Sequence, residues 1–292
     1  MKLKEALGTK KFIVTSEVQA PLLDAQPEDL VESLKRIRGR VHGVAVTDVE
    51  LQGVVGDTIQ TCELLEKNRF NSIYQTTTRD KNRVQLQKDL TDAHVAGVEN
   101  LLVFTEDYRI SGDSLQETMF FHVDSGKLAS VLDHIREGRT IEGQDLPNPV
   151  DFTLGSGVES LWGKNVPKQG MQEMESMREM GAGYFLTTPI FDLDQFQKFL
   201  RQVDTFNVPV IAEVLLLRNA AMARFINRHF KSGLVPDWVI QKLDKAPDKK
   251  RASIELFADL VKGLKEICHG IHIITMGGED KLQSYLDAAG LR

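Results

Sequence analysis

Short runs of β-branched and other apolar residues alternate with longer amphipathic stretches along the whole chain, and this alternation constrains the fold more than any other feature. It favours parallel strands joined by crossover helices. Eight strands are expected, at residues 12–17, 43–47, 72–77, 100–105, 152–156, 184–187, 208–213 and 270–275. Helices are expected from Pro27 onward and over residues 58–67, 82–96, 127–137, 169–180, 193–206, 221–230 and 249–269.

Eight strand–helix units fit either a closed barrel or an open, doubly wound sheet. The length of 292 residues is sufficient for a barrel, which needs roughly 250 residues to close. The first strand is not followed by the Gly-x-Gly-x-x-Gly motif of dinucleotide-binding open sheets, and no phosphate-binding Walker loop occurs. We therefore predict an α/β fold, a (β/α)₈ TIM barrel forming a single domain over residues 1–292.

The net charge and the hydropathy of the sequence limit which binding partners and which cellular location are expected. The net charge of −6 argues against nucleic acid as the main partner, because such binding needs a basic face. No apolar run approaches the ~18 residues that span a bilayer, and the first seven residues lack the apolar core of a secretory signal. We expect a cytoplasmic protein with no membrane partner.

The cysteines and histidines give no sign of a metal site. Cys62 and Cys268 lie far apart, without the spacing of a zinc site or a redox pair, and we expect two buried thiols. His272 falls inside the last predicted strand and is expected to be a core residue, while the other histidines show no ligand spacing.

The C-terminal ends of barrel strands meet in one mouth, so the polar residues there are the candidates for chemistry. Glu17 follows an apolar strand, and burial among apolar walls would raise the pKa of its carboxyl, as a general acid near neutrality requires. The alternative is an ordinary ionised carboxylate that caps a loop or pairs with Arg79 or Arg83. Asp107 would orient a substrate by accepting hydrogen bonds from an amidine-like ring edge, or it is a turn residue at the strand exit.

The segment from Gln75 to Arg83 places two arginines and a lysine where the third strand gives way to its helix. Backbone donors and the helix dipole at such a position favour a phosphate-bearing cofactor. The competing interpretation is a solvated charge run with Asp80 as the helix cap.

The aligned strand ends resemble the methylenetetrahydrofolate reductase family, particularly its short bacterial and acetogen-type members, from about Phe12 to Leu291. The motifs that carry the resemblance are Val14-Thr-Ser-Glu17 with Pro21, Val46-Thr-Asp48, Tyr74-Gln-Thr-Thr-Thr-Arg79 continuing to Arg83, Asn100-Leu-Leu-Val-Phe-Thr-Glu-Asp107, Leu186-Thr-Thr-Pro-Ile-Phe-Asp192 and Ile271-His-Ile-Ile-Thr-Met276.

The resemblance implies an oxidoreductase of one-carbon metabolism that interconverts 5,10-methylenetetrahydrofolate and 5-methyltetrahydrofolate by hydride transfer on a flavin, FAD or alternatively FMN. Glu17 would be the general acid, and Asp107 would hold the pterin and tune the flavin. The residues that would line the flavin site are Thr47, Gln75, Thr77, Arg79, Asp107 and Gly155. The residues that would contact the folate are Glu17, Asp107, Thr188 and Glu213. Electrons would come from NAD(P)H or from a partner electron-transfer subunit, and a homo-oligomer or hetero-complex is expected.

The sequence departs from the family pattern around this site. Glu106 stands where a glycine is usual, Thr188 where a folate-contacting glutamine is usual, and Met177 where a lysine approaches the flavin phosphates. Glu213 replaces a glycine, and Val158-Glu159 stands where Asn-Pro is common. These changes would weaken binding of an anionic dinucleotide. They leave open an alternative function, a barrel that binds a folate or other one-carbon carrier as a subunit or methyl-transfer partner without flavin reduction.

Overall fold

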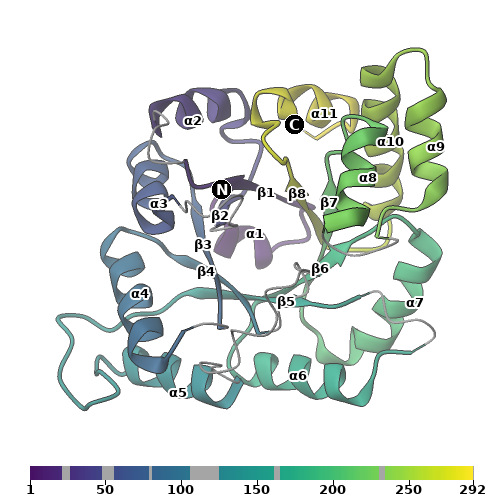
Figure 1. The fold of residues 1–292 in the computed structure, drawn as a ribbon. Helices are drawn as coiled ribbons and strands as arrows, with labels where there is room; N and C mark the ends of the chain where they lie inside the picture. The colour runs from purple at the N-terminus through teal and green to yellow at the C-terminus, as the bar shows by residue number, and fades with distance from the viewer. Residues whose placement is uncertain are drawn as a thin grey trace.

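Eight parallel strands close into a barrel, each strand pairing with the next and β8 pairing with β1 (Figure 1). The computed structural model describes residues 1–21, 27–47, 56–78, 81–105, 125–160, 165–229 and 234–291. The strands are β1 Ile13–Gln19, β2 Gly43–Thr47, β3 Ser72–Thr77, β4 Asn100–Phe104, β5 Thr153–Val158, β6 Tyr184–Pro189, β7 Val210–Leu215 and β8 Gly270–Ile274. The predicted (β/α)₈ barrel is confirmed.

Helices surround the strands, and α8, α9 and α10 gather on one side between β7 and β8 (Figure 1). The helices are α1 Leu3–Leu7, α2 Pro27–Leu34, α3 Thr58–Lys67, α4 Arg83–Val95, α5 Ser125–Arg136, α6 Lys168–Glu179, α7 Leu193–Val203, α8 Ala220–His229, α9 Asp237–Lys245, α10 Lys249–Leu264 and α11 Leu282–Ala288. Among the described helices, none combines the length and the apolar character needed to cross a bilayer.

Two apolar layers hold the barrel together, because side chains alternate between the two faces of each strand. The larger core packs the outward strand residues against the helices. A second cluster fills the barrel interior, where Ile13, Ile73 and Ile211 meet Leu3 and Ala6 of α1. The helix α1 therefore closes the end of the barrel at which the strands begin.

The stripe of methionines on α6 belongs to the outer core. Met174, Met177 and Met180 are buried, and the partly buried Met171 packs against the same core. The sequence spacing favoured this packing role. Met177 thus lies among apolar side chains between α6 and the barrel wall.

Several strands extend beyond their predicted ends, and this changes the depth of the candidate site. β1 continues to Gln19 because Val18 pairs with Val46 and Gln19 pairs with Thr47 on β2. β7 likewise continues past Glu213 to Leu215, against β8. Glu17 and Glu213 therefore lie within their strands rather than at the tips.

Candidate functional site

Glu17, His272 and Thr15 form a polar group inside the barrel. The Thr15 hydroxyl lies 2.8 Å from His272 Nδ1, and His272 Nε2 lies 3.9 Å from Glu17 Oε2. The His272 side chain is 2% exposed and that of Glu17 is 13% exposed. This arrangement places a shielded carboxyl and an imidazole next to each other, below the open end of the barrel.

The strand register explains why these residues meet. Thr15 pairs with His272 across β1 and β8, and His272 pairs with Glu213 across β8 and β7. Glu17 follows Thr15 by two residues and so shares its face of β1. Glu213 is buried and adds a second carboxyl to this side of the interior.

The prediction that His272 is a core residue does not account for the polar side chains around it. The imidazole is buried as expected, but its Nε2 has no hydrogen-bond partner among the described residues. The sequence carried one usable signal, the two-residue spacing of Thr15 and Glu17. Their contact with a residue more than 250 positions away requires closure of the barrel.

Gln75 contributes unpaired polar atoms on the β3 side of the interior. The side chain is buried, and neither its amide nitrogen nor its amide oxygen has a hydrogen-bond partner in the part of the chain that the structure describes. Burying an amide without partners is unfavourable. Gln75 therefore offers one donor and one acceptor to a ligand. Thr77, at the end of the same strand, is half-buried, and Thr47, at the end of the neighbouring β2, is buried.

Gly155 packs against the aromatic ring of Tyr184 and does not border an open cavity. A Cβ atom at this position would lie 2.2 Å from Cζ of Tyr184, which pairs with Gly155 across β5 and β6. The glycine makes room for the buried Tyr184 ring within the inner cluster. Its role in cofactor binding stays a prediction, and packing gives an independent reason for a glycine here.

Thr188 is tied to the exit of β5. Its hydroxyl donates to Glu159 Oε1 at 3.0 Å and also contacts the Ser160 hydroxyl at 2.8 Å. Glu159, which directly follows β5, and Thr188 of β6 both depart from the family pattern, and they are bonded to each other. The role of Thr188 in folate binding stays a prediction.

Part of the charged segment after β3 stabilises the fold. Lys81 Nζ donates to Asp89 Oδ2 at 2.7 Å, to Thr76 Oγ1 at 2.8 Å and to the Tyr74 hydroxyl at 3.3 Å. Burial acts to lower the pKa of Lys81, but Tyr74 and Asp89 more than offset it, so the pKa is raised. Asn82 caps α4 by accepting a hydrogen bond from the Gln85 amide, the role that the charge-run interpretation gave to Asp80.

We expect Asp89→Asn to destabilise the protein by about 2 kcal/mol, because it leaves the Lys81 ammonium in a largely shielded site without its counter-ion. Since the pKa of Lys81 is raised, this contribution is complete below 10.5, the value for a free lysine, and is lost as the pH rises through the higher folded value. Urea unfolding at pH 7.5 measures the change. Asp92→Asn breaks the exposed pair with Lys88 and should change the unfolding free energy by less than about 0.5 kcal/mol. Equal effects of the two variants would contradict this assignment.

Arg79 and Asp107, two predicted site residues, and Glu106 beside them lie outside the described residues. So do Asp48 and Asp80. The structure therefore brings together Glu17, Glu213, Thr47, Gln75 and Thr77 on the barrel interior and its rim, and the placement of Arg79 and Asp107 stays a prediction.

Both cysteines are free thiols, Cys62 buried and Cys268 partly buried. Burial raises the pKa of both thiols, that of Cys268 to about 11, although its contacts with the backbone of Gly270 and Ala212 act in the opposite direction. Neither cysteine occurs in a cluster of metal-binding side chains among the residues that the structure describes.

We expect both thiols to react slowly with a disulfide reagent at pH 8, because the thiolate is the nucleophile and both groups are shielded. A chromogenic thiol assay on the native protein measures the rate. Both cysteines should react at once in 6 M guanidinium, which serves as the control. Rapid, stoichiometric labelling of the native chain would show that one thiol is activated.

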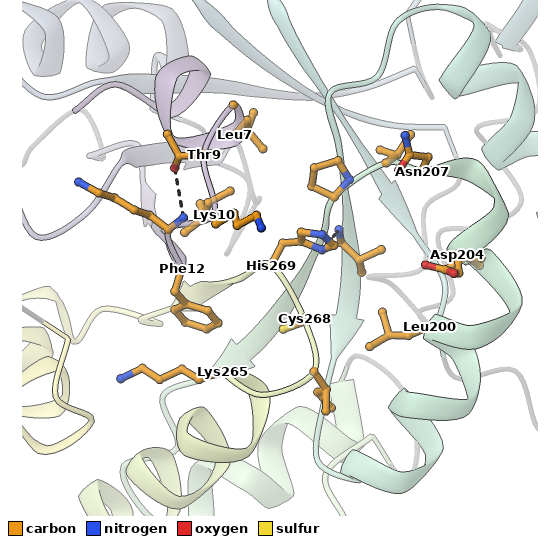
Figure 2. A pocket seen from close by; sticks show the side chains of 18 residues that line it. Leu7, Thr9, Lys10, Phe12, Leu200, Asp204, Asn207, Lys265, Cys268 and His269 are labelled. Carbon is orange, nitrogen blue, oxygen red and sulfur yellow. Dashed lines mark hydrogen bonds between the residues drawn. The ribbon is translucent and has the colours of Figure 1, made fainter.

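A hollow of about 610 Å³ lies at the opposite end of the barrel (Figure 2). It is lined by residues that precede β1, β7 and β8, including Lys10, Lys265 and His269. Lys265 Nζ donates to the Ala289 carbonyl, and His269 Nδ1 accepts from the Val210 amide, so both take part in internal bonds. Ligands of (β/α)₈ barrels bind at the C-terminal ends of strands, and this hollow lies at the N-terminal ends.

The fold and the interior polar group define a (β/α)₈ barrel protein with a carboxyl-bearing site toward the C-terminal ends of its strands. The model of the family "Methylenetetrahydrofolate reductase" matches residues 2–290, and the chain belongs to this family. No curated protein matches the sequence.

Solved structures resemble the chain in fold. An uncharacterized protein from Clostridium thermocellum, described as binding two copies of 5-methyl-5,6,7,8-tetrahydrofolic acid, is 16% identical with a TM-score of 0.63, over 98% of this chain and 97% of its own. Tryptophan synthase from M. tuberculosis is 11% identical with a TM-score of 0.55, covering 99% of both chains. A 2,3-dimethylmalate lyase is 11% identical with a TM-score of 0.52, covering 99% of this chain and 82% of its own. At these identities the likeness concerns the fold.

Proposed function

We propose that this chain is a flavin-dependent reductase that interconverts 5,10-methylenetetrahydrofolate and 5-methyltetrahydrofolate. The observation that carries the proposal is the shielded Glu17 carboxyl beside His272 in the barrel interior, within a chain of the methylenetetrahydrofolate reductase family. The folate ligand of the Clostridium thermocellum protein, which shares this fold, supports the substrate class.

The described residues fit a flavin ring. An isoalloxazine presents a donor and acceptors along one edge, and Gln75 has a buried amide with a donor and an acceptor that lack partners. Gln75, Thr47 and Thr77 would hold the ring, and Arg79 with the exposed Arg83 at the start of α4 would bind the phosphate, where backbone donors also favour an anion. The bound flavin would supply the hydride, and FAD is favoured over FMN by the family resemblance.

The chain's own residues would bind the folate and move a proton. Glu17 would donate its proton to the folate nitrogen as the five-membered ring opens, and its apolar strand neighbours would limit the access of water. Asp107 would accept hydrogen bonds from the pterin edge, and Glu213 and Thr188 would complete the folate site. Placement and electrostatics are the protein's contribution to this chemistry.

The absorption spectrum of the protein as isolated tests the proposal. We expect flavin bands, release of FAD on denaturation, and reduction of methylenetetrahydrofolate when a reductant is supplied. The absence of bands, together with failure to bind added FAD or FMN, would contradict the proposal. Comparing NADH oxidation by the chain alone and by a co-purified complex would show whether a partner subunit delivers the electrons.

A second function is favoured by a specific observation. Lys81 is bonded to Asp89, and Met177 is buried in the core, so neither provides a cation for a flavin phosphate. We therefore keep a folate-binding barrel without flavin as the alternative. Calorimetry that shows folate binding to a protein unable to bind flavin would favour it, and tight flavin binding would exclude it.

A further inference from the structure

We infer that His272 is a positioning residue that orients the Glu17 carboxyl group for proton transfer. The kinetic part of this inference rests on the proposed function. The structural part rests on the contacts among Thr15, His272 and Glu17.

The Thr15 contact favours a neutral His272 imidazole that carries its proton on Nε2. The Thr15 hydroxyl has one hydrogen, and its two possible acceptors are His272 Nδ1 at 2.8 Å and the Ile271 carbonyl at 3.4 Å. The shorter contact is the better hydrogen bond. A hydroxyl that donates to Nδ1 leaves the proton of the neutral ring on Nε2. The Nε2–H group is then the one that faces Glu17.

His272 Nε2, which carries the proton in this tautomer, is buried and lacks a hydrogen-bond partner among the described residues. Glu17 Oε2, at 3.9 Å, is beyond hydrogen-bonding distance, but a side-chain movement of about 1 Å would close the gap. An unpaired buried donor is unfavourable, and its desolvation favours that movement. A ligand in the mouth would displace water from Glu17 and strengthen the same contact.

This contact would fix the orientation of the acid. One carboxyl oxygen of protonated Glu17 would accept from His272 Nε2–H, so the O–H of the other oxygen would point to the ligand. When that proton moves to the folate nitrogen, the remaining carboxylate keeps the same donor, and His272 itself neither gains nor loses a proton. Among the described residues, the titratable side chains on the strands that flank His272 are Glu17 of β1 and Glu213 of β7.

Nitrogen-15 NMR of the imidazoles in the unliganded protein provides a test independent of activity, with His272→Gln used to assign the His272 signals. We expect the Nε2–H tautomer in the wild type, a shift of the His272 signals in Glu17→Gln, and a changed tautomer ratio in Thr15→Val but not in Thr15→Ser. A proton on Nδ1, or His272 signals that do not respond to Glu17→Gln, would overturn the inference whatever the activity.

Kinetics provides the second test. His272→Leu should lower kcat by about 10- to 100-fold with little change in KM, and His272→Gln, which keeps a donor near the Nε2 position, should recover most of the loss. The basic limb of the pH–kcat profile, where the general acid Glu17 loses its proton, should move in His272→Leu and return in His272→Gln. Wild-type kcat and an unchanged profile in His272→Leu would overturn the inference. An inactive wild type would count against the proposed function, and the NMR outcome alone would then decide the role of His272.

Discussion

Glu17→Gln is expected to lower folate turnover by about 10²- to 10⁴-fold, the contribution typical of a positioned general acid. The amide fills nearly the same volume as the carboxyl but has no acidic proton to give to the substrate. Glu17 is largely shielded and packs in the middle of a continuous strand, so the substitution should leave the fold intact. Steady-state reduction of methylenetetrahydrofolate measures the effect.

Two measurements separate chemistry from binding in this variant. The flavin spectrum and the folate affinity should remain close to those of the wild type, because Gln75, Thr47 and Thr77 are unchanged. Glu32→Gln is the matched control, since Glu32 is an exposed carboxylate on α2 that lies away from the barrel interior. Full turnover in Glu17→Gln would remove Glu17 from the mechanism.

Gly155→Ala is expected to destabilise the fold by about 1–3 kcal/mol, because the new methyl group would lie 2.2 Å from the Tyr184 ring. The ring is fully enclosed by the inner cluster and cannot move aside without disturbing its neighbours. Thermal unfolding should show a fall in Tm of about 5 °C. Shortening the ring residue, in Gly155→Ala with Tyr184→Leu, should recover part of the loss.

Gly183→Ala is the control for this substitution. A Cβ atom there would meet its nearest neighbour, the Leu154 carbonyl, at 3.6 Å, which is an ordinary contact. Its effect on the unfolding free energy should stay within about 0.5 kcal/mol. If Gly155→Ala instead kept its stability and lost flavin affinity, the cofactor role predicted from the family resemblance would replace the packing explanation.

The bounds of helices and strands were predicted correctly from the sequence where local signals mark both ends of an element. The helix α3 begins and ends at the predicted residues because Asp57 caps it and the chain turns at Asn68. The strands β2 and β3 also match. By contrast, α1 spans five residues, too few for a periodic pattern, and it owes its stability to tertiary contacts of Leu3 and Ala6. The helices α9 and α11 were missed as well.

The candidate site was predictable in its residues and less so in its contacts. Glu17, Gln75 and Glu213 could be named because barrel strands carry their functional side chains toward one end. The bond from Thr15 to His272 links the first and last strands, and no local pattern reports such a pair. The bond of Thr188 to Glu159 and the pairing of Lys81 with Asp89 were equally hidden, because each depends on which strands and helices become neighbours.

The short helix α1 controls whether solvent can enter the barrel from the end at which the strands begin. Leu3 and Ala6 are completely enclosed and belong to the same apolar cluster as Ile13 and Ile211, so α1 seals this end of the barrel interior. Removal of residues 1–7 would let solvent enter at this end of the barrel and reach the side chains that pack next to Thr15 and His272. Shortening the chain at that end would thus hydrate the barrel interior without altering any residue at its opening.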